Sequence, residues 1–240
     1  MRKDAVVLIL GAGSGTRLWP LTAFMPKVLL PVSLDKKFIT FALEATLKTN
    51  YKTYILNGIN WLPKFEKFIH RNKVQVDLLT SNQKLETGGE LLQHINFLTR
   101  LENCRYFFII PGDYFIEKID FKTVIDLMDH QQLDICLFGC ESKNYGEYIK
   151  LNKNGLIKEI STSKSNISSV GIYAIKTNLL SANGHLKNKR ITTTELLNMF
   201  AKKGYRLGVF FFKDKWKDLG TWPRYMSFVF SFNIKRFMYL

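Results

Sequence analysis

Residues 8–32 read LILGAGSGTRLWPLTAFMPKVLLPV, an apolar segment that runs directly into a loop rich in glycine. Glycine adopts positive φ at little cost and lets the backbone approach a ligand closely, so successive N–H groups of such a loop can face an anion. In an open α/β sheet, ligands bind beyond the carboxyl ends of the strands, which is where a loop that follows a first strand lies. The stretch therefore predicts a phosphate-binding loop directly after a strand at 5–10.

The loop does not complete either of two common nucleotide-binding fingerprints. Leu18 stands where a G-x-G-x-x-G motif would need its third glycine, and the Walker pattern is absent. Three prolines between positions 20 and 31 stiffen the segment, so Arg17 and Lys27 are expected to be held over the ligand that the glycines bind. Two cations over a phosphate-binding loop indicate chemistry at phosphorus.

Outward from this loop, short β-rich segments alternate with segments of helical period, which is typical of a mostly parallel sheet flanked by helices. The expected strands are 5–10, 53–57, 74–79, 105–110, 133–139, 170–175 and 205–212. Apolar residues at helical spacing predict three helices, around 38–45, 121–128 and 193–200. Asn154-Gly155 favours a tight turn between short strands at 147–152 and 156–161, so we expect a small β-hairpin inserted in an α/β fold.

The C-terminal segment from Trp222 carries Tyr225, Phe228, Val229 and Phe232 at helical spacing. A last helix packed on the domain is the ordinary interpretation of such a stripe. A helix that lies on a membrane or contacts another subunit is the alternative.

Composition narrows the class of protein. The chain has 240 residues, 46% of them hydrophobic, and its apolar segments are too short to cross a membrane, so we expect a soluble, cytoplasmic protein without a transmembrane segment. Its 35 Lys and Arg against 20 Asp and Glu give a net charge of +15, which favours anionic partners. The basic residues are spread along the chain without an RNA-binding or zinc-finger motif, so nucleic acid is not the expected partner.

Cys104, Cys136 and Cys140 are expected to be buried free thiols.

At this point the sequence resembles the nucleotidyltransferases that join a nucleoside triphosphate to a sugar 1-phosphate. The resemblance rests on the glycine loop with its arginine, on the Pro-Lys-x-x-x-Pro-Val string at 26–32, and on later strings at 87–89, 112–113, 171–173 and 216–221. It covers nearly the whole chain and implies a Rossmann-like, glycosyltransferase-A-like fold. We therefore expect a single domain, 1–240, with a nucleotide-binding half at about 1–115 and a sugar-binding half at about 116–240.

The resemblance also implies roles for individual residues. Arg17, Lys27, Asp113 and Asp218 would be catalytic, and the two aspartates would bind Mg²⁺, a hard cation that prefers oxygen ligands. The remaining nucleotide-binding residues would be Leu10, Gly11, Ala12, Gly13, Ser14, Gly15, Thr16, Ser81, Glu86, Thr87, Gly88 and Gly112. The sugar-binding residues would be Gly146, Glu159, Gly171 and Tyr173.

Two departures from the family's pattern bear on the substrates. Glu86 stands where a glycine usually approaches the base, and its carboxylate could crowd the base or accept hydrogen bonds from guanine. A Glu-Lys-Pro string ordinarily contacts the sugar phosphate, but Thr162-Ser163-Lys164 stands here, with Glu159 three positions earlier. Either Glu159 and Lys164 substitute from shifted positions, or the sugar site differs from the common one.

The resemblance implies transfer of a nucleoside monophosphate from a triphosphate to a sugar 1-phosphate, with release of pyrophosphate, in the synthesis of sugar nucleotides for polysaccharides. Guanylyl transfer to mannose or heptose 1-phosphate is the slightly preferred version. The family's usual form also leads us to expect a homo-oligomer. The alternative is a catalytically weak paralogue that binds nucleotide or sugar nucleotide as a regulatory or assembly subunit.

Overall fold

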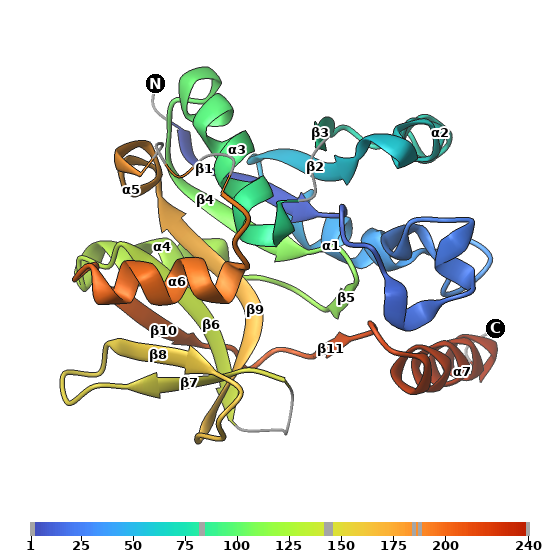
Figure 1. Ribbon diagram of the computed structural model, residues 1–240. Helices are drawn as coiled ribbons and strands as arrows, with labels where there is room; N and C mark the ends of the chain where they lie inside the picture. The colour runs from blue at the N-terminus through green and yellow to red at the C-terminus, as the bar shows by residue number, and fades with distance from the viewer. Residues whose placement is uncertain (1–2, 82–84, 142–145, 184–185, 187–188, 239–240) are drawn as a thin grey trace. The chain divides into compact units, whose positions relative to one another are not determined.

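The computed structural model describes residues 3–81, 85–141, 146–183, 186 and 189–238 (Figure 1). The strands are β1 (Lys3–Leu10), β2 (Lys52–Gly58), β3 (Asp77–Ser81), β4 (Cys104–Pro111), β5 (Tyr114–Ile116), β6 (Ile135–Glu141), β7 (Tyr148–Leu151), β8 (Ile157–Ser161), β9 (Ile167–Lys176), β10 (Leu207–Phe211) and β11 (Trp216–Asp218). The α-helices are α1 (Phe38–Thr46), α2 (Leu62–Asn72), α3 (Glu86–Leu101), α4 (Phe121–His130), α5 (Thr177–Ala182), α6 (Thr193–Lys202) and α7 (Trp222–Met238). Four short 3-10 helices complete the description: η1 (Thr16–Leu18), η2 (Leu21–Ala23), η3 (Lys27–Leu29) and η4 (Ile59–Trp61).

The strands form the mostly parallel, helix-flanked sheet that the sequence predicts. The hydrogen-bonded order of the main sheet is β10-β6-β9-β4-β1-β2-β3, with the β7–β8 hairpin beside β9. β10 pairs in parallel with β6, and β2 pairs in parallel with β3. β9 runs antiparallel to both β4 and β6, and the β7–β8 hairpin beside it is antiparallel as well. The predicted α/β fold with an inserted hairpin is therefore confirmed.

Some boundaries differ from the sequence prediction. β3 begins at Asp77 rather than at residue 74, β6 lies two residues later than expected, and β10 is shorter than 205–212 at both ends. Residues 86–89, which the sequence analysis did not assign to a helix, form the first turn of α3. β5 and β11 were missed because three-residue strands are too short to show a periodicity.

The chain divides into two compact units, each built from segments that are distant in sequence. The first unit contains Met1–Leu8, Gln83–Ile110 and Asp120–Lys213. The second contains Ile9–Asn82, Pro111–Ile119 and Asp214–Leu240.

The second unit is organised around α1 and α7. Phe38 of α1 contacts Tyr225 of α7 edge to face, with ring centroids 5.2 Å apart, and Phe41 contacts Phe228 in the same way at 5.7 Å. The Tyr225 hydroxyl donates to the carbonyl oxygen of Pro31 at 2.7 Å. The apolar stripe of the C-terminal helix is thus packed on its own unit, which is the ordinary one of the two interpretations.

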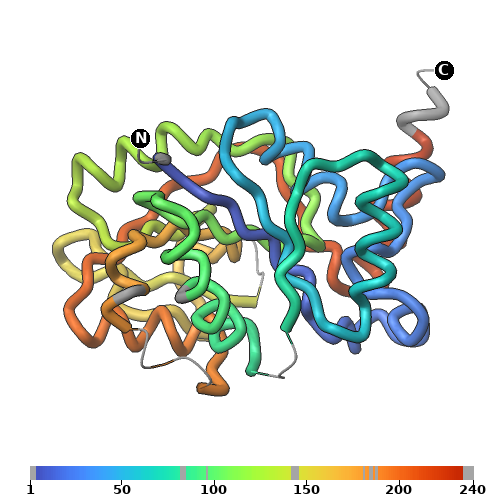
Figure 2. The backbone as a smooth tube through the Cα atoms, turned by 90° about the horizontal axis from the view of Figure 1, so that it is seen from above, coloured from blue at the N-terminus to red at the C-terminus, as the bar shows by residue number. Residues whose placement is uncertain are grey.

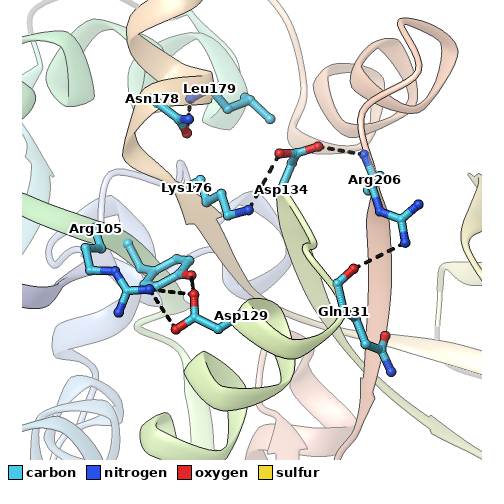
Figure 3. A network of polar contacts seen from close by, with 9 residues as sticks. Arg105, Asp129, Gln131, Asp134, Lys176, Asn178, Leu179 and Arg206 are labelled. Atoms are coloured by element: carbon cyan, nitrogen blue, oxygen red, sulfur yellow. Dashed lines mark hydrogen bonds and ion pairs between the residues drawn. The ribbon is translucent and has the colours of Figure 1, made fainter.

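The first unit contains a polar network at the C-terminal end of α4 (Figure 3). Arg105 donates to both carboxylate oxygens of Asp129, at 2.5 and 2.7 Å, and the Tyr106 hydroxyl donates to the same group. Burial raises the pKa of Asp129, but the hydrogen bonds from Tyr106 and Arg105 outweigh it and hold this pKa below its ordinary value. Nearby, the Arg206 backbone N–H donates to Asp134 at 2.9 Å. The network fixes α4 against β4 and is structural.

Three further sequence expectations can be assessed. The hairpin turns at Asn154-Gly155, where Gly155 has φ +75°. Cys104, Cys136 and Cys140 are buried thiols that form no disulfide among the described residues, as predicted. Within the described part of the chain, none of the helices combines the length and the apolar character needed to cross a membrane.

Candidate active site

The glycine loop in the second unit leaves β1 and is held at both ends. The Gly11 N–H donates to the carbonyl oxygen of Leu56 at 2.7 Å, and a Cβ at Gly11 would lie only 3.0 Å from that oxygen. Gly15 has φ +66°, and its carbonyl oxygen accepts from the Thr22 hydroxyl at 3.0 Å. Between these anchors, Gly13 is exposed, with open space where a Cβ would lie. The middle of the loop is therefore accessible to a ligand.

The other loop residues line this accessible segment. Ala12 is half-buried, and Ser14 and Thr16 are exposed. Arg17 lies in η1 with its side chain exposed, and it makes no ion pair within the described residues. Figure 2 traces the backbone of this part of the chain in blue. The exposed Arg17 side chain is thus accessible to an anion, and its role in binding one stays a prediction.

The ends of neighbouring strands meet beside the loop. The Gly112 N–H donates to the carbonyl oxygen of Leu10 at 2.9 Å, and a Cβ at Gly112 would lie 2.8 Å from the same oxygen. Glycine is therefore needed at position 112 for close packing against β1. Ser81, at the end of β3, is buried opposite Gly58 of β2.

Two short strands bring the two candidate metal-binding aspartates together. β11 pairs antiparallel with β5, and Asp218 lies opposite Tyr114, the residue that follows Asp113. The Leu219 N–H also donates to the carbonyl oxygen of Asp113 at 3.3 Å. Two residues separated by more than one hundred positions thereby become neighbours.

Each aspartate has a cationic partner. Lys27 forms an ion pair with Asp113, and Arg224 of α7 forms one with Asp218. Both carboxylates are largely buried, with side-chain exposures of 17% for Asp113 and 16% for Asp218. At these exposures the charges are poorly screened by water, so each pair interacts more strongly than an ion pair on the surface.

Gly220 marks the point at which these groups converge. A Cβ on Gly220 would lie 2.6 Å from Lys27 Nζ, 2.7 Å from Asp218 Oδ1 and 3.4 Å from Asp113 Oδ2. The Gly220 N–H donates to Asp218 Oδ1 at 2.7 Å. The space is open only because residue 220 has no side chain, and one amine and two carboxylates face it.

This donor set fits a magnesium ion. Mg²⁺ is usually bound through one or two carboxylates, with water and substrate phosphate oxygens in its other positions. Asp113 and Asp218 supply two carboxylates around the space at Gly220, and no cluster of three or more His, Cys, Asp or Glu suited to a metal occurs among the described residues. Such a site would leave most positions on the ion for water and phosphate.

The predicted base-binding residues lie in the first unit, in the first turn of α3. Glu86 has φ +60°, a conformation that favours glycine, which explains why a glycine would suit this position. Its carboxylate accepts hydrogen bonds from Arg190, at 2.9 Å from one terminal nitrogen and 3.3 Å from Nε. A guanine base would have to share this carboxylate with Arg190.

The glycines that follow have a packing role. A Cβ at Gly88 would lie 2.6 Å from the Thr192 carbonyl oxygen, and one at Gly89 would lie 2.2 Å from the Lys189 carbonyl oxygen. The Gly89 N–H donates to the Ile191 carbonyl oxygen at 3.0 Å. The backbone of 189–192 thus packs directly on the two glycines. The neighbouring Thr87 is exposed.

The predicted sugar-binding residues also lie in the first unit. Gly146 and Gly171 have φ of +46° and +79°, and Tyr173 is buried on β9. Glu159 is exposed on the hairpin and pairs with Lys150 across it at 3.2 Å. Glu147, which the sequence analysis did not select, accepts a hydrogen bond from the Thr194 hydroxyl.

The sequence predicts Arg17, Lys27, Asp113 and Asp218 as the catalytic residues, and the structure brings the last three together at Gly220. Sequence reasoning missed Arg224 and Gly220. Gly220 lay within a quoted string and could have been selected from it. Arg224 carried no signal of its own, because its contact with Asp218 depends on how α7 packs.

The sequence was compared with those of known protein families. The sequence model of the nucleotidyl transferase family matches residues 6–231, nearly the full length of the chain. The chain belongs to the nucleotidyl transferase family. The expected family is thereby confirmed.

The relatives of this nucleotidyl transferase family member include two named enzymes. A glucose-1-phosphate adenylyltransferase of Desulforamulus reducens is 26% identical, over 92% of this chain and 62% of that protein. A bifunctional sugar-1-phosphate nucleotidylyltransferase/acetyltransferase of Sulfurisphaera tokodaii is 24% identical, over 88% of this chain and 51% of that protein. The chain thus spans about half to two thirds of the length of these relatives.

Solved structures share the fold. A UDP-glucose pyrophosphorylase in complex with UDP-glucose superposes with a TM-score of 0.76 at 22% identity, covering 98% of this chain and all of the other. A putative glucose-1-phosphate thymidylyltransferase from Bacillus anthracis gives a TM-score of 0.76 at 20% identity, covering 95% of each chain. The nucleotidyl transferase fold inferred from the sequence is confirmed.

Proposed function

We propose that this chain transfers a nucleoside monophosphate from a nucleoside triphosphate to a sugar 1-phosphate. A phosphate oxygen of the acceptor attacks the α-phosphorus of the triphosphate, and the bond from that phosphorus to the oxygen bridging the β-phosphorus breaks. The products are a nucleoside diphosphate sugar and pyrophosphate. The observation that carries the proposal is the convergence of Lys27, Asp113 and Asp218 at Gly220, in the same unit as the open glycine loop.

In the second unit, the N–H groups of the glycine loop and two cationic side chains would bind the phosphates of the substrates. The exposed N–H groups around Gly13 would bind phosphate oxygens, and Arg17 would hold the leaving pyrophosphate. Lys27, which lies with Asp113 and Asp218 around Gly220, would bind the reacting phosphates. Both reactants are anions, so positioning and charge neutralisation are the main tasks, and no covalent intermediate is needed.

Asp113 and Asp218 would hold Mg²⁺. When bound, the ion would supply positive charge that neutralises the phosphate oxygens during the reaction. Arg224 would keep the carboxylate of Asp218 in place through its ion pair.

The base and the acceptor are left open in this proposal. The four relatives and solved structures cited above carry adenylyl, nucleotidylyl, UDP or thymidylyl in their names, and the contact between Glu86 and Arg190 competes with guanine for the carboxylate. Guanylyl transfer to mannose or heptose 1-phosphate stays a prediction. The regulatory alternative is weakened because the cationic and acidic groups that turnover requires are all present.

The test is pyrophosphate release from a panel of nucleoside triphosphates and sugar 1-phosphates, with Mg²⁺ present and with it chelated. Asp113→Asn and Asp218→Asn should each lower the rate by roughly 100-fold or more, since each removes a charge at the reacting phosphates. Asp126→Asn is the matched control, because Asp126 lies on the exposed face of α4, where it pairs with Lys122. Full activity in both Asp113→Asn and Asp218→Asn, or activity that does not need Mg²⁺, would contradict the proposal.

A further inference from the structure

Asp113 and Asp218 of the second unit differ in which carboxylate oxygen pairs with a cation. Asp218 faces the space at Gly220 through Oδ1, which accepts from the Gly220 N–H, and it pairs with Arg224 through Oδ2. Asp113 faces the same space through Oδ2, and this is the oxygen with which Lys27 pairs. Arg224 thus binds the oxygen of Asp218 that lies farther from the space, whereas Lys27 occupies the facing oxygen of Asp113.

The Lys27 side chain reaches this oxygen from the glycine loop. Its Cβ lies 3.0 Å from the position that a Cβ on Gly15 would occupy, so its stem packs directly on the loop that would bind phosphate. Its amine lies 2.6 Å from the position of a Cβ on Gly220. The lysine stem is flexible, so the amine can change partners without movement of the backbone. Lys27 therefore lies between a phosphate-binding loop and a pair of carboxylates.

The position of the Lys27 amine sets it against a metal ion at the same oxygen. An ammonium group and a divalent cation that share one carboxylate oxygen repel each other. The side chains of Lys27 and Asp113 are only 12% and 17% exposed, so water screens this repulsion poorly. A triphosphate carries anionic oxygens that can accept hydrogen bonds from the ammonium group in place of Asp113. Lys27 and the metal ion thus compete for Asp113 until a triphosphate binds.

We propose that Lys27 is an exchangeable counterion, which pairs with Asp113 before the triphosphate binds and moves to a phosphate when it does. This inference rests on the proposed function and adds a coupling between two of its ligands. Once the amine has moved, the facing oxygen of Asp113 is available to a divalent cation. Because such coupling is reciprocal, each ligand strengthens the binding of the other. The protein therefore binds Mg²⁺ weakly by itself and tightly together with the triphosphate.

The first test measures binding of Mn²⁺, a paramagnetic probe for the magnesium site, to the protein without nucleotide. Electron paramagnetic resonance gives the concentration of unbound Mn²⁺. Lys27→Met should bind Mn²⁺ at least about tenfold more tightly than the wild-type protein, because the competing ammonium group is removed. Lys52→Met is the matched control, since Lys52 lies in the same unit and its ion pair with Asp77 is exposed. Its Mn²⁺ affinity should change less than about threefold.

A second comparison separates direct competition from the loss of a nearby charge. Arg224→Met should strengthen Mn²⁺ binding less than Lys27→Met does, because Arg224 pairs with the oxygen of Asp218 that lies farther from the space. Equal Mn²⁺ affinity in Lys27→Met and the wild-type protein would overturn the inference. An equal gain in Lys27→Met and Lys52→Met would overturn it too, since net charge alone would then account for the gain.

A further test uses only the wild-type protein and does not depend on the folding of a variant. Reductive dimethylation, read for each lysine by mass spectrometry, reports how accessible each amine is. Mg²⁺ alone should raise the labelling rate of Lys27 at least about threefold, because its amine is displaced from Asp113. Inorganic triphosphate added with excess Mg²⁺ should lower the rate again, while Lys52 should react at one rate throughout. A Lys27 rate that Mg²⁺ leaves unchanged or lowers would overturn the inference.

Neither measurement depends on turnover, so the inference and the proposed function can fail separately. Absence of pyrophosphate release with every substrate pair would contradict the proposed function, while Mn²⁺ binding and lysine labelling would still decide the role of Lys27. Pyrophosphate release together with equal Mn²⁺ affinity in Lys27→Met and the wild-type protein would support the proposed function and overturn the exchange.

Discussion

At the scale of the residue, the second unit balances two carboxylates with two cations. Asp113 and Lys27 could be predicted from the sequence because they lie in recognisable strings, and so could Asp218. Arg224 could not be predicted, since an arginine in the first turns of a helix is ordinary and only the packing of α7 brings it to Asp218.

The ion pair between Arg224 and Asp218 predicts that Arg224 both orients the Asp218 carboxylate and places a positive charge beside it. Arg224→Met should lower kcat about tenfold, because the Asp218 carboxylate loses the group that orients it. It should also lower the Mg²⁺ concentration needed for half the maximal rate, because a positive charge beside a metal ligand is removed. Arg224→Lys should restore part of kcat.

The measurement is a magnesium titration of pyrophosphate release. Arg100→Met, which changes an exposed arginine in α3 of the first unit, is the control and should behave like the wild-type protein. Identical kcat and magnesium dependence in Arg224→Met and the wild-type protein would show that the ion pair does not act on the site.

At the scale of the element, the long strands and the amphipathic helices could be predicted because their apolar periodicity is strong. β1, β2 and β4 lie close to the predicted ranges, and so do α1, α4 and α6. The start of α3 could not be predicted. Two consecutive glycines disfavour a helix, and here the helix is stabilised by the backbone of 189–192, which packs on those glycines.

That packing predicts different results for two glycine substitutions. Gly89→Ala should lower the free energy of unfolding by about 2–3 kcal/mol, because the new Cβ would lie 2.2 Å from the Lys189 carbonyl oxygen. Gly13→Ala should change it by less than about 0.5 kcal/mol, because a Cβ at Gly13 meets open space. Urea unfolding of both variants checks this, and equal midpoints for the two would contradict the assigned packing.

At the scale of the whole molecule, the fold class could be inferred from the sequence but the composition of the two units could not. Each unit combines three segments, and their boundaries depend on contacts between residues far apart in the chain. The same long-range contacts, such as the pairing of β5 with β11, bring Asp113 and Asp218 together. A periodicity detects local structure and carries no information about such pairings.

The exposed face of α7 bears on assembly. Met226, Phe230 and Ile234 recur every four residues and are 55%, 71% and 43% exposed, on a helix whose other side packs on its own unit. We expect this face to be covered in a homo-oligomer, because burying such side chains stabilises association. Light scattering at micromolar concentration should give at least twice the mass of one chain, and Phe230→Glu should reduce it. A monomeric wild-type protein would contradict this expectation.

The proposed reaction moves the α-phosphorus of a nucleoside triphosphate onto a sugar 1-phosphate. The most direct measurement follows nucleoside triphosphates labelled at the α-phosphorus, each incubated with Mg²⁺ and a panel of sugar 1-phosphates. We expect the label to appear in a nucleoside diphosphate sugar only when both substrates are present, and we expect Asp113→Asn nearly to abolish this product. Label that stays in the triphosphate with every acceptor, or that moves to nucleoside monophosphate without an acceptor, would contradict it.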